Sequence, residues 1–141
     1  MRKIKFRGKD KADTWVYGGL TQSVTDKGTE YFIVQNDFSF ISVDPDTVGQ
    51  YTGLEDRNGK EIYEGDVLIG DGTIKFLVQY SEPKHSFCMT SIEDMNALPD
   101  FDSSFMIRNV WWERYRKTII GNIYDNPELV KQKDNDNETE K

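Results

Sequence analysis

Short stretches in which apolar and polar residues alternate recur along most of the chain. In the clearest stretch, every second residue is a large apolar one: Ile74, Phe76, Val78 and Tyr80. An alternation with a period of two is typical of a β-strand that has one buried face. We therefore expect a strand over 74–80, with these four side chains turned toward the interior.

Nine further segments carry comparable short apolar runs and are predicted to be strands: 4–7, 15–20, 31–35, 38–43, 48–51, 67–69, 87–90, 105–112 and 117–124. Most are bounded by Gly, Asn, Asp or Pro, which favours antiparallel meanders over parallel units with helical crossovers. Asn58-Gly59 and Asp71-Gly72 predict tight reversals, because both pairs tolerate positive φ angles. Gly18-Gly19 interrupts a strand pattern and predicts a bulge or a bend.

Helical signals are few. Ser91 is followed by acidic residues at 93 and 94, which is typical of a capped helix start, and Pro99 ends that helix within about two turns. A second short turn is predicted at Asn126-Pro127, where Asn caps and Pro occupies the first helical position. The sequence thus predicts an all-β (mainly β) fold of antiparallel strands with at most two short helices.

The predicted strands fall into two groups. An N-terminal β lobe covers residues 1–60, and a second lobe over 61–130 has the strand spacing of a small, strongly bent barrel. Residues 131–141 contain no apolar side chain, so burial cannot offset the entropy of ordering them. We expect a disordered polar tail there.

Three parts of the chain resemble the YopX family, which consists of small proteins encoded by phages and prophages of bacteria. The resemblance rests on Ile4–Lys9 with Trp15–Gly18, on Thr47–Asp66, and on Ile119–Leu129, and it spans about residues 1 to 130. It implies a nearly all-β fold with an SH3-like barrel in the second half. The family has no assigned activity, so the resemblance carries over no catalytic or ligand residue, and the segment 80–104 matches none of its motifs.

The chain contains few of the residues that catalysis or metal binding usually requires. A single histidine, His85, is expected at the surface, and a single cysteine, Cys88, is expected in the core, which excludes a zinc site built from several such ligands. The run 56–61 is interpreted as a turn, because its glycine comes too early for a calcium loop. A carboxylate site at Glu61, Glu64 and Asp66 remains an alternative. We predict a protein that is not an enzyme and uses no cofactor or metal.

The expected cellular location follows from the lack of a membrane-spanning or signal-like segment in the sequence. No apolar run approaches the roughly 20 residues that a membrane helix needs, and the basic start is not followed by an apolar stretch. We expect a cytoplasmic protein of the bacterial host.

Charge is distributed unevenly. The chain carries a net charge of −7, with +5 in residues 1–11 and −11 in residues 12–130. Cations and aromatic rings interleave only over 108–117, an arrangement that suits stacking with single-stranded nucleic acid. Folded beside the basic N-terminus, this segment would complete a candidate binding patch: Arg2, Lys3, Lys5, Arg7, Trp111, Trp112, Arg114, Arg116 and Lys117. In the structural alternative, one tryptophan fills the core and the arginines share an outer face.

Three functions are compatible with these observations. The leading hypothesis is a phage or prophage accessory protein that binds a protein partner, including further copies of itself through exposed strand edges, and we expect a homo-oligomer. A second hypothesis is single-stranded nucleic-acid binding through the patch. A third is an acidic decoy that engages the basic surface of a host protein, which the charge of −11 would suit.

Overall fold

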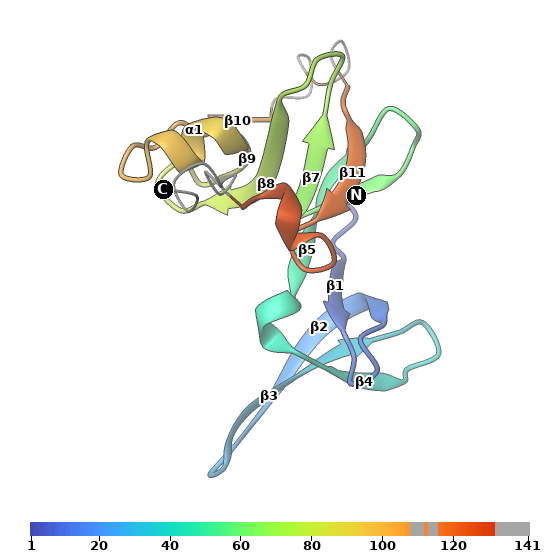
Figure 1. The fold of residues 1–141 in the computed structure, drawn as a ribbon. Helices are drawn as coiled ribbons and strands as arrows, with labels where there is room; N and C mark the ends of the chain where they lie inside the picture. Colours follow the sequence, from blue (N-terminus) through green and yellow to red (C-terminus); the bar gives the residue numbers. More distant parts are fainter. Residues whose placement is uncertain (108–111, 113–115, 132–141) are drawn as a thin grey trace. The chain divides into compact units, whose positions relative to one another are not determined.

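Figure 1 shows the computed structural model, which describes residues 1–107, 112 and 116–131 and divides into two units, Met1–Gly65 and Asp66–Lys141. Each unit is built on one antiparallel sheet, so the predicted all-β class is confirmed. No helix in the described part of the chain is long and apolar enough to cross a membrane. Apart from Lys131, the predicted tail lies outside the described residues.

The sheet of the N-terminal unit has six strands in the order β4-β3-β2-β1-β5-β6. Their bounds are β1 Phe6–Lys9, β2 Trp15–Thr25, β3 Gly28–Val34, β4 Phe40–Val43, β5 Gly49–Glu55 and β6 Glu61–Tyr63, with a 3-10 turn η1 at Pro45–Thr47. Ile33, Val43 and Ile62 form part of its buried interior. At Gly8 an added Cβ would lie 3.0 Å from the Cβ of Val43, so β1 passes close to the end of β4.

Gly18 and Gly19 mark the point where β2 changes partner. Gly18 is paired with Phe6 of β1, whereas Gly19 is paired with Val34 of β3. Gly18 has a φ of +158°, and a Cβ there would overlap the carbonyl oxygen of Val34. The interruption predicted at these two residues therefore corresponds to a change of strand partner, and at Gly18 this change leaves no room for a side chain.

The reversal predicted at Asn58-Gly59 is confirmed. It connects β5 to β6, and Gly59 has a φ of +81°. Asp56 organises the turn, since its Oδ1 accepts hydrogen bonds from the backbone N–H groups of Asn58 (2.8 Å) and Lys60 (2.9 Å). The run 56–61 is thus a turn held by an aspartate side chain.

The sheet of the C-terminal unit has five described strands in the order β10-β9-β8-β7-β11. Their bounds are β7 Asp66–Ile69, β8 Lys75–Ser81, β9 Ser86–Ser91, β10 Phe105–Met106 and β11 Thr118–Asn122. The hairpin predicted between β7 and β8 is present, but Asp71 and Gly72 lie in a loop over 70–74 and neither has a positive φ, so the reversal is wider than the tight turn that was predicted. Among the described residues β10 pairs only with β9 and β11 only with β7, so this sheet is open and the predicted SH3-like barrel is not confirmed.

The predicted interior face of β8 is partly wrong. Val78 is fully buried, but Ile74 and Tyr80 are 48% and 41% exposed, and Leu77, expected on the outer face, is buried. The reason is that both faces of this sheet are covered near its centre. On one face Leu77 packs with Val67 of β7 and Ile92, beneath a short helix.

Both predicted helical turns are present, but the cap predicted at Asn126 is wrong, because its side chain makes no cap hydrogen bond and its Oδ1 instead accepts one from the N–H of Asn122 (3.2 Å). The helix α1, Ile92–Ala97, is capped by Ser91, whose Oγ accepts a hydrogen bond from the N–H of Asp94, and η2 covers Pro127–Leu129. Pro99 ends α1, because the residue before a proline is driven out of helical geometry, and Leu98 has φ −133°. Of the strand predicted over 105–112, residues 108–111 lie outside the described residues; β10 covers Phe105–Met106, and Trp112 is helical and buried.

Candidate binding site

Arg7, one member of the predicted basic patch, is an interior residue of the N-terminal unit. Its side chain lies between two rings, with Cζ 4.4 Å from the ring centroid of Trp15 and 5.0 Å from that of Tyr63. Nη2 donates a hydrogen bond to the carbonyl oxygen of Glu64 (3.3 Å), and the residue is only 5% exposed. Arg7 therefore organises the interior and offers no charge to a surface ligand.

Two cations that precede β1 lie against a carboxylate. Lys5 Nζ lies 2.8 Å from Glu61 Oε1, and Lys3 Nζ lies 3.6 Å from Glu61 Oε2. Burial acts to raise the pKa of Glu61, but the hydrogen bond and charge of Lys5, the hydroxyl of Tyr63 and the charge of Lys3 together bring that pKa below its ordinary value. The positive charge of Lys3 and Lys5 is thus partly neutralised. Arg2 is exposed.

The remaining patch residues belong to the C-terminal unit, where Trp112 is almost completely buried. This agrees with the structural alternative, in which one tryptophan fills the core. Arg116 and Lys117 are half-buried, and Lys117 Nζ lies 4.8 Å from the ring centroid of Phe76. Trp111 and Arg114 lie outside the described residues. Of the nine residues, the structure brings Lys3 and Lys5 together at Glu61.

The candidate chemical residues occupy ordinary structural positions. His85 is exposed in the turn between β8 and β9, and Cys88 is buried, as both were predicted to be. Glu64 accepts a hydrogen bond from the N–H of Gln50 (2.9 Å), and Asp66 is buried in β7. Within the described residues, no group of three His, Cys, Asp or Glu side chains is arranged to hold a metal ion.

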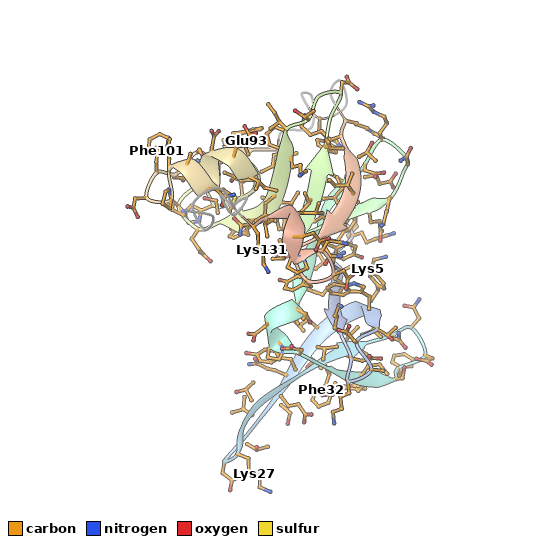
Figure 2. The ribbon with its side chains drawn as sticks, in the orientation of Figure 1. Lys5, Lys27, Phe32, Glu93, Phe101 and Lys131 are labelled. Carbon is orange, nitrogen blue, oxygen red and sulfur yellow. The ribbon has the colours of Figure 1, made fainter. Side chains whose placement is uncertain are left out.

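A pocket of about 510 Å³ lies entirely within the C-terminal unit, at the β8–β9 hairpin and the loop that follows α1. That volume is in the range of cavities that hold ligands. Its apolar lining comes from seven residues: Tyr80, Pro83, Cys88, Met95, Leu98, Pro99 and Phe101. Figure 2 labels Phe101 on the loop beyond α1. This site was missed by the sequence analysis, which had only noted that 80–104 matched no family motif.

The local sequence explains the shape of this pocket. Ser81 and Ser86 close the β8–β9 hairpin, whose turn is held by a hydrogen bond from the N–H of His85 to the carbonyl of Glu82 (3.2 Å). On the other side, the chain leaves α1 at Leu98 and turns back through a hydrogen bond from the N–H of Phe101 to the carbonyl of Leu98 (3.1 Å). Two tight turns therefore face the same hollow.

Lys84 joins these two sides. Its Nζ lies 3.2 Å from Asp102 Oδ2, 2.8 Å from Ser104 Oγ and 2.5 Å from the carbonyl oxygen of Ser104. Asp102 also accepts hydrogen bonds from the hydroxyl and the N–H of Ser104, and these bonds, with Lys84 next, hold the pKa of Asp102 below its ordinary value. The loop that lines the pocket is thus attached to the hairpin by a fixed set of polar contacts.

Two features of the pocket point toward a bound molecule. Leu98 and Phe101 are 53% and 66% exposed, although both are large and apolar. The hydroxyl oxygen of Ser103, which also lines the pocket, is buried and has no hydrogen-bond partner among the described residues. A buried hydroxyl without a partner costs about 1–3 kcal/mol, and a ligand group that bonds to it removes that cost.

Comparison with known proteins identifies the family of this chain. The family model described as "YopX protein" matches residues 5–131. The chain belongs to the YopX family. The resemblance seen in the three sequence segments is therefore confirmed, and the matched range includes the pocket. None of the curated proteins matches this YopX-family chain.

One solved structure is similar to this YopX-family protein over most of its length. It is the crystal structure of protein EF1440 from Enterococcus faecalis, with 24% sequence identity and a TM-score of 0.52. The alignment covers 93% of this chain and 100% of that chain. At this identity the likeness supports the fold alone.

The wall of the pocket carries both apolar and polar groups. Its surface combines an apolar floor with hydroxyl groups and two carboxylates, those of Glu82 and Asp102. Such a surface can enclose an apolar side chain and donate or accept hydrogen bonds around it. Of these two carboxylates, Asp102 is already paired with Lys84, which lies in the adjoining turn.

Proposed function

We propose that this YopX-family chain is a non-catalytic binding module that holds a segment of a protein partner in the pocket of its C-terminal unit. The resemblance to phage and prophage proteins extends the proposal to an accessory protein of the bacterial cytoplasm. The observation that carries it is the pocket itself, with large apolar side chains exposed at its wall and the buried Ser103 hydroxyl.

A polypeptide segment suits this site for energetic reasons. Leu98 and Phe101 are 53% and 66% exposed, so covering what remains exposed of each is worth about 0.8–2 kcal/mol, and the two together supply about 2–4 kcal/mol before the costs of association. Protein partners commonly insert one apolar side chain as an anchor into a pocket of this kind. The peptide backbone beside that anchor carries N–H and C=O groups that can bond to Ser103.

The titratable groups of the pocket support binding over catalysis. Asp102 has a lowered pKa and is paired with Lys84, which makes it a weak proton acceptor. The thiol of Cys88 is buried, and its Sγ lies 3.6 Å from the carbonyl oxygen of Ser86. A nucleophile within reach of a base is the minimum that group-transfer chemistry requires. The lining residues offer hydroxyl groups and carboxylates with no histidine among them.

Of the two alternative functions, the acidic surface has more support than the nucleic-acid site. The burial of Arg7 and the pairing of Lys3 and Lys5 with Glu61 reduce the positive charge that phosphate groups would contact. A site that binds phosphate groups is positively charged, whereas the pocket carries two negatively charged carboxylates. They favour a partner that is itself positively charged.

Selection from a random peptide library displayed on phage, using the immobilised full-length chain, tests the proposal. Enriched peptides are synthesised and titrated by calorimetry against the unaltered chain and against Leu98→Asp. The matched control is Val24→Asp, because Val24 is an exposed apolar residue on β2 of the other unit.

We expect Leu98→Asp to weaken peptide binding at least about tenfold, since a charge replaces apolar contact area, whereas Val24→Asp leaves it unchanged. Circular dichroism of each variant checks that the fold is retained. Failure to enrich any peptide, or equal binding by Leu98→Asp and the unaltered chain, would refute the proposal.

A further inference from the structure

We propose that the segment bound in the pocket is basic, with an aliphatic or aromatic anchor side chain next to lysine or arginine. This inference rests on the proposed function and names the chemistry of the partner. It follows from the charge of the pocket wall and not from its apolar lining.

The segment that forms the pocket is strongly acidic. Residues 79–104 contain five carboxylates and a single cation, Lys84, which gives a net charge of −4. All five acidic residues are exposed: Glu82, Glu93, Asp94, Asp100 and Asp102. Glu82 and Asp102 line the pocket, and Asp100 lies between the lining residues Pro99 and Phe101.

The single cation of this segment is already used inside the protein. Lys84 Nζ contacts Asp102 and two oxygen atoms of Ser104, so its charge is directed at the loop it holds. Its contacts balance one carboxylate, and Glu82 at the pocket wall with Asp100 between two lining residues keeps the surroundings of the pocket negative. A positively charged partner is attracted to such a surface, and a phosphate-bearing one is repelled.

Charge and apolar contact have different roles here. An exposed ion pair changes a dissociation constant only about 1.5- to 5-fold, so the acidic residues select the partner more than they hold it. Removal of Leu98 and Phe101 from water supplies most of the affinity. The expected ligand therefore needs both parts, an apolar anchor and flanking cations.

The peptide selection itself provides the first test. We expect the enriched peptides to contain lysine or arginine within about two residues of a large apolar side chain. Each enriched peptide is then resynthesised with its cations replaced by glutamine, and separately with its anchor replaced by serine. Fluorescence anisotropy at 50 mM and 300 mM salt measures the dissociation constants.

Three results are expected. Removal of two cations weakens binding about 2- to 25-fold at low salt, and the difference shrinks at high salt. Replacement of the anchor weakens binding at both salt concentrations. The double variant Glu82→Gln/Asp100→Asn binds the basic peptide more weakly and the glutamine peptide unchanged, whereas Asp26→Asn, at an exposed site of the N-terminal unit, changes neither.

The outcomes separate the two proposals. Neutral or acidic enriched peptides that still require Leu98 would overturn the basic-partner inference and leave the binding function intact. Loss of all peptide binding would overturn both. A fluorescein-labelled 20-nucleotide oligo(dT) serves as the nucleic-acid probe, and we expect no binding at 50 mM salt. If the probe did bind, and if it bound the variant Glu82→Gln/Asp100→Asn more tightly than the unaltered chain, the inference would be overturned, because the ligand would then be anionic.

Discussion

Lys84 Nζ lies 3.2 Å from Asp102 Oδ2 and thereby links the β8–β9 hairpin to the loop that precedes β10. We predict that Lys84→Gln loosens this loop, because the contacts to Asp102 and Ser104 are lost together. Backbone amide hydrogen exchange at 102–104 should become faster, while Tm falls by no more than about 5 °C, since partly exposed ion pairs contribute little to global stability. Lys27→Gln, at the exposed tip of the β2–β3 hairpin, is the control. Unchanged exchange at 102–104 would contradict the linking role.

Arg7 is predicted to stabilise the N-terminal unit. Arg7→Ala should lower the free energy of unfolding by about 2–4 kcal/mol, because it removes two cation–π contacts and leaves a gap between Trp15 and Tyr63. Urea unfolding followed by tryptophan fluorescence measures the change. Arg2→Ala, at an exposed site, should change it by less than about 0.5 kcal/mol. Equal effects at the two positions would disprove the interior role of Arg7.

The two adjacent glycines of β2 should respond differently to alanine. Gly18→Ala is expected to cost more than about 2 kcal/mol, because its Cβ would overlap the carbonyl oxygen of Val34. At Gly19 an added Cβ meets no atom within 4 Å, so Gly19→Ala should be neutral or stabilise by up to about 1 kcal/mol. Thermal unfolding of the pair of variants compares them directly, and a similar Tm for both would exclude the close approach of β2 and β3.

Phe38 has a backbone conformation that an aromatic residue rarely adopts. Its φ is +64°, and its side chain is 83% exposed. We predict that Phe38→Asn raises the free energy of unfolding by about 0.5–1 kcal/mol, since asparagine tolerates the left-handed region. Phe40→Asn should not stabilise, because Phe40 has no positive φ and its ring packs against Phe32 at 6.4 Å. Chemical denaturation measures both, and a loss of stability in Phe38→Asn would show that the exposed ring contributes to the fold.

The Lys5–Glu61 pair predicts a pH dependence of stability. The pKa of Glu61 in the folded protein is below the ordinary value of 4.5, so ionised Glu61 favours the folded state. Its contribution is complete above that ordinary value and is lost as the pH falls through the lowered pKa. Lys5→Gln should therefore reduce stability at pH 6 and have less effect at pH 3. Urea midpoints measured from pH 3 to pH 7 test this, and a difference that is constant with pH would contradict it.

Several elements of the fold could be predicted because their causes are local. Asn58-Gly59 reverses the chain because Gly59 adopts a positive φ, and Ser91 with Pro99 sets the two ends of α1. These effects act within a few residues, so the residue order alone is sufficient to show them. The core position of Cys88 followed from its apolar character, whereas the sequence pattern did not decide which of the two adjacent tryptophans would be buried, and the structure buries Trp112.

Other features depended on residues that are distant in sequence. Leu77 is buried because α1 returns over that face of β8, and Ile74 and Tyr80 are exposed because the cover of the sheet does not extend to its ends. Arg7 belongs to a basic run, yet its burial is decided by rings from β2 and β6. The pocket likewise arises where a hairpin turn and the loop after α1 come together.

The sequence by itself determined the β class of this chain, its main turns and its family, because hydrophobic period, turn chemistry and motif are properties of neighbouring residues. Only the tertiary structure decided which faces are covered, which cations are neutralised and where a ligand can be held. Those properties depend on how segments distant in sequence pack against one another. The residue pattern of one strand does not show which other element covers each of its faces.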